Sequence, residues 1–310
     1  MEENVSDYES ILKDCGVGTE PVNVVIKTIS GLEEFYGSKD IVGIYNYILK
    51  TVDIPEVLIH VIRLTESYRN DDTLKILLNM LKKDYKSDEY INVRVMCAKA
   101  IANYKDTSTL VELLSCLNNK NEDYKVRLAC ADALGRIGDR FAVKPLLDVV
   151  EDEEEKSVYL KESAAFALGL LGDTSAIDPL IAILEAKQGL LDKFSFLKEK
   201  IVESLGKLNF HNKKIIKALK TALMDSSPIV RINAIEAIMN SDDENSIELI
   251  KPCLNDDDDE VKRNALIALY NLIGRDILEE VIELPIYSNF LKQEAQNLLE
   301  EYENGEDEDE

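Results

Sequence analysis

A chain of 310 residues is long enough for two globular domains or one extended array. Its 36 Lys and Arg against 60 Asp and Glu give a formal net charge of −24, which disfavours nucleic-acid backbones and anionic membrane surfaces. We therefore expect a protein partner with a basic segment, no nucleic acid and no membrane. The acidic N-terminal stretch and the shortness of the apolar runs predict a cytoplasmic protein.

The first 85 residues predict helices separated by polar turns. The stretches that begin at Val24 and Val57 each read as helix, turn and helix, without a recurring signature. We interpret residues 1–85 as degenerate helical repeats that form an N-terminal cap.

Residues 86–273 contain one pattern six times, at a period typical of helical solenoids. The residue that opens the first helix of each repeat, here called the anchor, is apolar: Val93, Val126, Leu160, Leu197, Val230 and Val261. The next residue is always basic: Arg94, Arg127, Lys161, Lys198, Arg231 and Lys262. Five residues before the anchor the side chain is acidic or an amide: Asp88, Asn121, Glu155, Asp192, Asp225 and Asp256. Apolar residues four, five and eight positions after each anchor mark one buried helical stripe.

The turn between the two helices of a repeat has its own signals. Gly138 and Gly172 suit a left-handed helix end, and Asp106, Asp139 and Asp173 can accept hydrogen bonds from free amides at the next helix start.

The period, the acid six residues before a base, and the stretches "VRLACADALGRIGDRFAVKPLL" and "LKESAAFALGLLGDTSAIDPLI" resemble HEAT repeats, in particular the HEAT-like type named after phycobilisome (PBS) lyases. The resemblance implies an all-α fold, an α-solenoid that is a right-handed superhelix of antiparallel helical hairpins. It also implies a structural ladder of acidic and basic residues along the stack. In this chain the ladder would comprise Asp88, Arg94, Arg127, Lys161, Asp192, Lys198, Asp225, Arg231, Asp256 and Lys262. The equivalent residues of two repeats differ in type: Asn121 is an amide, and Glu155 is a glutamate where the other repeats have an aspartate.

The C-terminal residues predict a closing element. We expect residues 274–303 to form a capping hairpin with a polar outer face. Residues 304–310, with five acids and no apolar side chain, predict a disordered acidic tail.

Catalytic chemistry is poorly represented in the sequence. The two histidines, His60 and His211, lie far apart, and the five cysteines form no Cys-x-x-Cys pair. Cys97, Cys116, Cys130 and Cys253 occupy repeated apolar positions and are predicted to be buried free thiols, whereas Cys15 has no assignment. We therefore expect no enzyme activity, no catalytic residue, no metal and no cofactor. An enzyme, or an enzyme subunit, of the phycobilin-lyase type is the alternative that the repeat type implies.

The favoured function is a protein-binding scaffold, or an assembly or maturation factor, monomeric on its own. In the resembling family the anchor helices line the concave surface of the solenoid. The residues expected to bind a partner there are Phe166, Leu170, Leu128, Arg136, Asp132, Glu162, Glu199, Glu203 and Glu236. Phe166 and Leu170 have the composition of a binding hot spot, and the glutamates would steer a basic segment. A core position for Phe166, between helices, is the equally open alternative.

Overall fold

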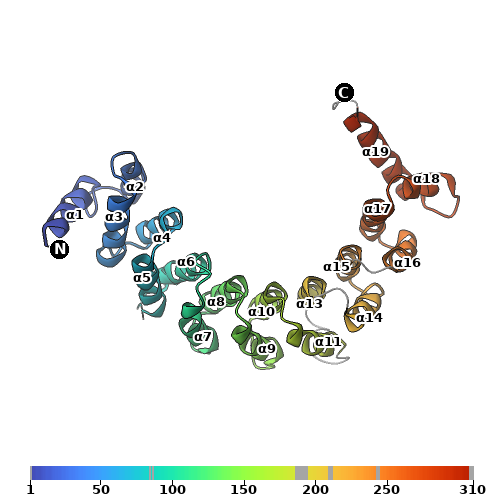
Figure 1. Cartoon of the computed structure of the whole chain (residues 1–310), viewed down its shortest axis with the longest axis horizontal. Coiled ribbons are helices and arrows are strands. Elements are labelled where there is room, and N and C mark those ends of the chain that lie inside the picture. Colours follow the sequence, from blue (N-terminus) through green and yellow to red (C-terminus); the bar gives the residue numbers. More distant parts are fainter. Residues whose placement is uncertain are drawn as a thin grey trace. The chain divides into compact units, whose positions relative to one another are not determined.

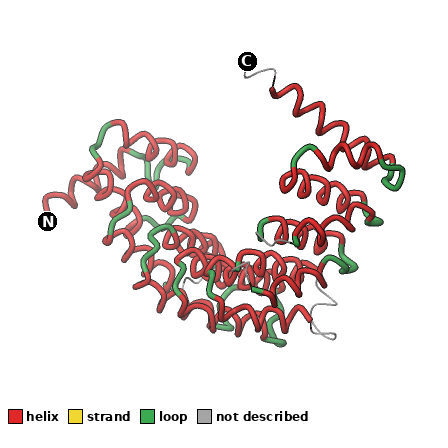
Figure 2. The backbone as a smooth tube through the Cα atoms, turned by 45° about the vertical axis from the view of Figure 1, so that its right-hand side comes forward, coloured by secondary structure: helices red, strands yellow, loops and turns green. Residues whose placement is uncertain are grey.

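The protein is built from α-helices joined by short 3-10 helices and loops (Figure 2). The computed structural model describes residues 2–83, 85, 87–185, 195–208, 212–241 and 245–306, and no strand occurs among them. This confirms the all-α solenoid predicted from the repeat period. No helix in the described ranges combines the length and the apolar character that a membrane span needs.

The chain divides into two units, Met1–Leu146 and Leu147–Glu310, and each is described by itself. The division falls within the predicted repeat array 86–273. The helix α9 (Val143–Glu151) contains the boundary.

Unit 1 begins with α1 (Glu2–Asp14) and continues with two alternating series of helices. One series is α2 (Val22–Gly31), α4 (Pro55–Leu64), α6 (Ile91–Ala102) and α8 (Tyr124–Ile137). The other is α3 (Ser38–Thr51), α5 (Asp71–Lys82) and α7 (Leu110–Asn118). Successive members of each series pack on one another, as expected for stacked helical hairpins.

Unit 2 follows the same plan (Figure 1). Its first series, here called the anchor row, is α10 (Val158–Leu171), α13 (Ser195–Lys207), α15 (Pro228–Met239) and α17 (Asp259–Ile273). The second series is α11 (Ile177–Glu185), α14 (Lys213–Ala222), α16 (Ser246–Ile250) and α18 (Asp276–Glu283). The last helix, α19 (Asn289–Glu306), packs against α17 and α18, where the closing hairpin was predicted. The described helix therefore extends into the first residues of the predicted acidic tail, and residues 307–310 lie outside the described part.

Small residues let the helices of the anchor row approach closely. A Cβ atom added to Gly169 of α10 would lie 2.8 Å from the Ser204 Cα of α13, and one added to Gly206 of α13 would lie 2.7 Å from the Ala237 Cβ of α15. The Ser204 hydroxyl donates to the Ala165 carbonyl at 2.7 Å, which links α13 to α10 directly. The small side chain seven residues after each anchor thus sets a tight helix spacing.

The turn signals act as the sequence predicts. Gly138 and Gly172 end α8 and α10 with φ of 82° and 66°, a left-handed conformation that a side chain would strain. Asp106, Asp139 and Asp173 each accept a hydrogen bond from the amide two residues further on, at the start of the next 3-10 helix. Each repeat therefore carries its own stop and start signals.

Candidate functional site

The predicted ladder takes a definite form in unit 1. Arg94, at the start of α6, donates from Nη1 to Glu122 Oε1 at 2.8 Å, and its Nη2 pairs with the second oxygen of the same carboxylate. Its Nε donates to the Leu81 carbonyl at 2.8 Å. The acidic partner is thus Glu122, one residue after the Asn121 that the repeat alignment selected, and Asp88 is not the partner of Arg94.

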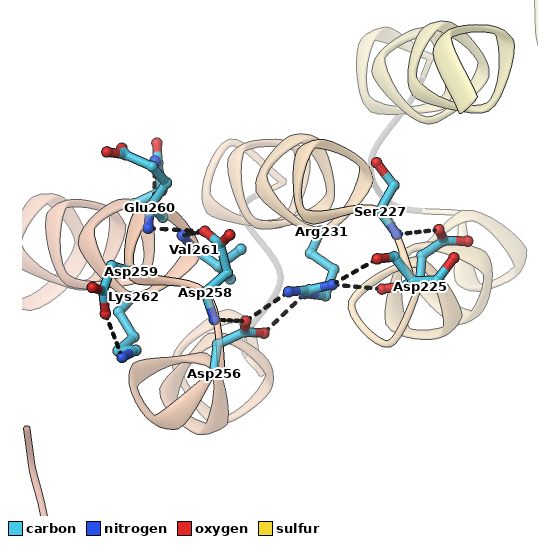
Figure 3. A network of polar contacts seen from close by, with 11 residues as sticks. Asp225, Ser227, Arg231, Asp256, Asp258, Asp259, Glu260, Val261 and Lys262 are labelled. Carbon is cyan, nitrogen blue, oxygen red and sulfur yellow. Dashed lines mark hydrogen bonds and ion pairs between the residues drawn. The ribbon is translucent and has the colours of Figure 1, made fainter. Parts of the chain in front are cut away.

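Two further rungs lie in unit 2, and Figure 3 shows the one between Arg231 and Asp256. Lys198 Nζ lies 2.8 Å from Asp225 Oδ2, and Arg231 holds Asp256 with two hydrogen bonds of 2.9 and 2.7 Å. Asp225 and Asp256 also accept from the backbone amides of Ser227 and Asp258, both at 2.9 Å. Each acid therefore shapes the turn before one anchor helix and binds the basic residue of the preceding repeat.

Other basic ladder residues use different partners. Arg127 donates to the Leu117 carbonyl at 2.8 Å, and the fully buried Lys161 donates to the carbonyls of Val150 and Asp152. Lys262 pairs with Asp259 of its own helix at 2.6 Å, which departs from the expected pairing between repeats. Asp192 lies outside the described residues. The basic position is therefore a structural link in several geometries.

The anchor row of unit 2 presents one face away from its core. On an α-helix, positions −1, +2, +6 and +10 from the anchor share a side, and we call this side the anchor face. On α10 it carries Glu162, a half-buried Phe166 and an exposed Leu170. On α13 it carries Glu199 and Glu203, and on α15 an exposed Glu236. Six of the predicted partner-binding residues thus lie on this face.

The other three predicted residues, Leu128, Asp132 and Arg136, lie on α8 in unit 1. Arg136 is exposed, and its Nε pairs with Asp132 at 3.0 Å along the helix. They are described apart from the unit 2 group, so the predicted site is divided between two units.

Two carboxylates on the anchor face, Glu162 and Glu199, share one nearby cation, Lys200, whose charge acts to lower the pKa of both without overcoming burial. Glu199 is buried and Glu162 is half-buried. Burial raises the pKa of both groups, and the negative charge of Glu199 raises the pKa of Glu162 further. These two side chains and Lys200 therefore form one electrostatically coupled cluster on the anchor face.

Phe166 is half-buried and lies beside two lysines of α13. Lys207 Nζ lies 4.4 Å and Lys200 Nζ 5.3 Å from its ring centroid, within the range of cation–π attraction. Both lysines also pair with Glu203. Burial opposes ionisation of Glu203, but these lysine hydrogen bonds outweigh it and lower the pKa of this carboxyl. The ring is therefore covered by a small ionic network.

Sequence reasoning missed a row of exposed apolar residues on the same face. The row contains the second residue of each of three helices: Tyr159 on α10, Phe196 on α13 and Ile229 on α15. Their exposed fractions are 67%, 63% and 48%. The signal was present in the repeat alignment, because all three directly precede an anchor. We call these three residues the apolar ridge.

The sequence pattern of HEAT repeats matches residues 85–159 and 187–270, and that of the PBS lyase HEAT-like repeat matches residues 160–186. The chain belongs to the HEAT-repeat family. No curated protein matches this chain.

Solved HEAT-type structures share the fold at low identity. Kap95p is 14% identical with a TM-score of 0.62, and the match covers 94% of this chain and 46% of that one. Kap121p bound to Nup53p is 10% identical with a TM-score of 0.50, covering 89% of this chain and 37% of that one. The complex of CpcE and CpcF of phycocyanin lyase from Nostoc sp. PCC7120 is 21% identical with a TM-score of 0.46, covering 75% of this chain and 96% of the other. This HEAT-repeat chain thus spans under half of the two karyopherin chains.

All five cysteines of this HEAT-repeat protein are buried and free. Burial raises the pKa of Cys97 to about 12 and that of Cys253 to about 11. A hydrogen bond with Cys130 lowers the pKa of Cys116, and the nearby Arg94 guanidinium acts in the same direction. The predicted burial of the four repeat cysteines is confirmed, and Cys15 is buried with them.

Of the two histidines, the structure describes His60, which contacts a serine hydroxyl. His60 Nε2 lies 2.8 Å from the Ser30 hydroxyl, which itself donates to the Ile26 carbonyl at 3.0 Å. His211 lies outside the described residues, and the described ones contain no group of three or more His, Cys, Asp or Glu that could hold a metal.

Proposed function

We propose that this HEAT-repeat protein is a non-catalytic scaffold or assembly factor that binds a protein partner on the anchor face of unit 2. The observation that carries the proposal is the apolar ridge, because three large apolar side chains stand exposed in successive repeats on one face. Large apolar side chains that recur on one exposed face are typical of interaction sites.

The charges beside the ridge favour a partner with a basic segment. Glu162 and Glu199 lie one helical turn after Tyr159 and Phe196 on the same face, and the pKa of both carboxyls stays raised although Lys200 lies nearby. A ridge of apolar side chains next to two largely buried carboxylates is complementary to a segment that alternates apolar and basic residues.

Proteins of similar fold bind proteins. Kap121p is bound to Nup53p in one such structure, and Kap95p binding acts on RanGDP in another. These partners belong to those proteins, and they support the proposal for this chain only through the shared fold.

The test is affinity capture from the source cells with the wild-type chain and with Phe196→Ser, each at low and high salt. Phe141→Ser is the matched control, because Phe141 is 72% exposed but lies outside the anchor face. The expected result is a protein that the wild type and Phe141→Ser retain and that Phe196→Ser loses. With that protein purified, Phe196→Ser should weaken binding by about 2 kcal/mol or more, mainly through faster dissociation.

Equal retention of every partner by the three chains would remove the site from the anchor face. Capture of a chromophore with visible absorbance, in place of a protein, would instead favour the lyase-type alternative.

A further inference from the structure

The apolar ridge has a regular geometry that restricts what can bind it. Each of its members is the second residue of its helix, so one side chain projects per repeat at the same height. In the next helix, α17, this position is Glu260, which pairs with Arg263. The ridge therefore ends after three members.

The spacing of the ridge follows from the close packing of its helices. The near contacts of Gly169 with Ser204 and of Gly206 with Ala237 place neighbouring helices at the close end of the usual range, about 8–10 Å between axes. Equivalent side chains on successive helices should recur at about the same interval.

This interval distinguishes among the regular conformations of a bound segment. A β-strand presents side chains on one side about every 6.8 Å, which is too short. An α-helix repeats a face after one turn at about 5.4 Å, or two turns at about 10.8 Å. A polyproline-II segment repeats a side every three residues, at about 9.3 Å, which falls within the helix spacing.

The charge pattern adds a second requirement. Glu162 and Glu199 both lie three residues beyond a ridge member, on the neighbouring helices α10 and α13. Glu199 is 8% exposed. Lys200 already acts on both carboxylates, but the pKa of each stays raised, so one further cationic side chain at this spot would relieve their mutual repulsion.

Building on the proposed function, we propose that the bound partner segment is an extended, polyproline-II stretch with apolar residues at three-residue intervals. Its apolar side chains contact Tyr159, Phe196 and Ile229, and one Lys or Arg between the first two contacts Glu162 and Glu199. About seven partner residues suffice to span the ridge.

The test uses the full chain and three labelled synthetic peptides with the same net charge. The first consists of three Leu-Pro-Arg repeats, the second has the same composition with the leucines grouped together, and the third is a helix-forming peptide with leucines seven residues apart. The expected result is binding of the first peptide at least tenfold tighter than of the other two.

Two variants test the location of this binding. Phe196→Ser should weaken binding of the first peptide at least tenfold, and Glu199→Gln should weaken it about threefold and reduce its salt dependence. Phe141→Ser should leave it unchanged, and circular dichroism checks that each variant keeps its helical content.

Equal binding of the three peptides, preference for the helical one, or no binding at all overturns the extended-segment inference. If the captured protein partner still depends on Phe196 in that case, the proposed function stands without it. If neither the peptide nor the protein partner responds to Phe196→Ser, both proposals fail.

Discussion

Two neighbouring stretches of the anchor row in unit 2 differ in how their acidic residues are neutralised. In the stretch of α15 and α17, Arg231 binds Asp256 with two hydrogen bonds, and Arg263 pairs with Glu260 and, on the adjoining α19, with Glu294. On α10 and α13, Glu162 and Glu199 share only the nearby charge of Lys200, and burial keeps the pKa of both raised.

The difference does not come from the number of acids, because both stretches follow the same repeat register. It comes from the residue two positions after the anchor, which is Arg263 on α17 but Glu162 on α10 and Glu199 on α13. The arginine ties its neighbouring carboxylates into ion pairs that hold helices together. The two glutamates instead add negative charge beside the apolar ridge.

The largest effect is expected from breaking the neutralised stretch. Arg231→Met should lower the free energy of unfolding of unit 2 by about 3 kcal/mol, because Asp256 would lose its cation in a position where both side chains are only 13% exposed. Urea unfolding followed by circular dichroism measures it. Lys217→Met on α14, an exposed lysine, is the control and should change stability by about 0.5 kcal/mol or less. Equal losses for the two variants would mean that the Arg231 rung contributes little.

A smaller loss is expected from Phe166→Ala in the other stretch. The ring is half-buried and lies beneath Lys200 and Lys207, so its removal should cost about 2 kcal/mol of folding stability. This lies below the roughly 3–5 kcal/mol of a core phenylalanine. Leu170→Ala, at a position 39% exposed, serves as the comparison and should cost less. If Phe166→Ala has the same Tm as the wild type, the ring contributes little to folding, and the hot-spot interpretation of Phe166 is favoured.

The smallest effect is a gain in stability from Glu199→Gln. Because burial raises the pKa of Glu199 in the folded protein, folded chains bind its proton more readily than unfolded ones. Stability is therefore lost as pH rises through this raised pKa, and at pH 7 the penalty of the charge is complete. Glu199→Gln removes that penalty and should raise Tm by about 1–2 °C at pH 7.

The gain should shrink as pH falls towards 4, where the wild-type carboxyl is increasingly protonated. Glu236→Gln, an exposed position on the same face, should produce a smaller change. A lower Tm for Glu199→Gln at pH 7 would show that this carboxylate has a stabilising partner.

The sequence predicted the helical repeats well, because each repeat carries its own buried stripe, left-handed glycine and capping aspartate. It predicted individual partners less well. Arg94 binds Glu122 instead of an acid in perfect register, since a long Glu side chain one residue later reaches the same point. Lys262 turns to Asp259 because four consecutive aspartates offer a nearer carboxylate.

The candidate site shows the same limit more strongly. Helical periodicity identified the face that carries Phe166, Glu162 and Glu199, but it gives no information on which side chains long lysines cover. The apolar ridge was overlooked because the position before each anchor looks like part of a loop in the sequence. The exposure of these three side chains depends on where each helix begins in the folded structure, which the sequence pattern does not specify.

The double role of the ladder acids has a consequence for how unit 2 comes apart. Asp225 and Asp256 each organise the turn that starts one helix while holding a basic residue of the helix before it. A turn that loosens thereby releases a contact in the neighbouring repeat as well. Such shared carboxylates make the opening of adjacent repeats cooperative, so fraying that starts at one of these turns is transmitted to its neighbour.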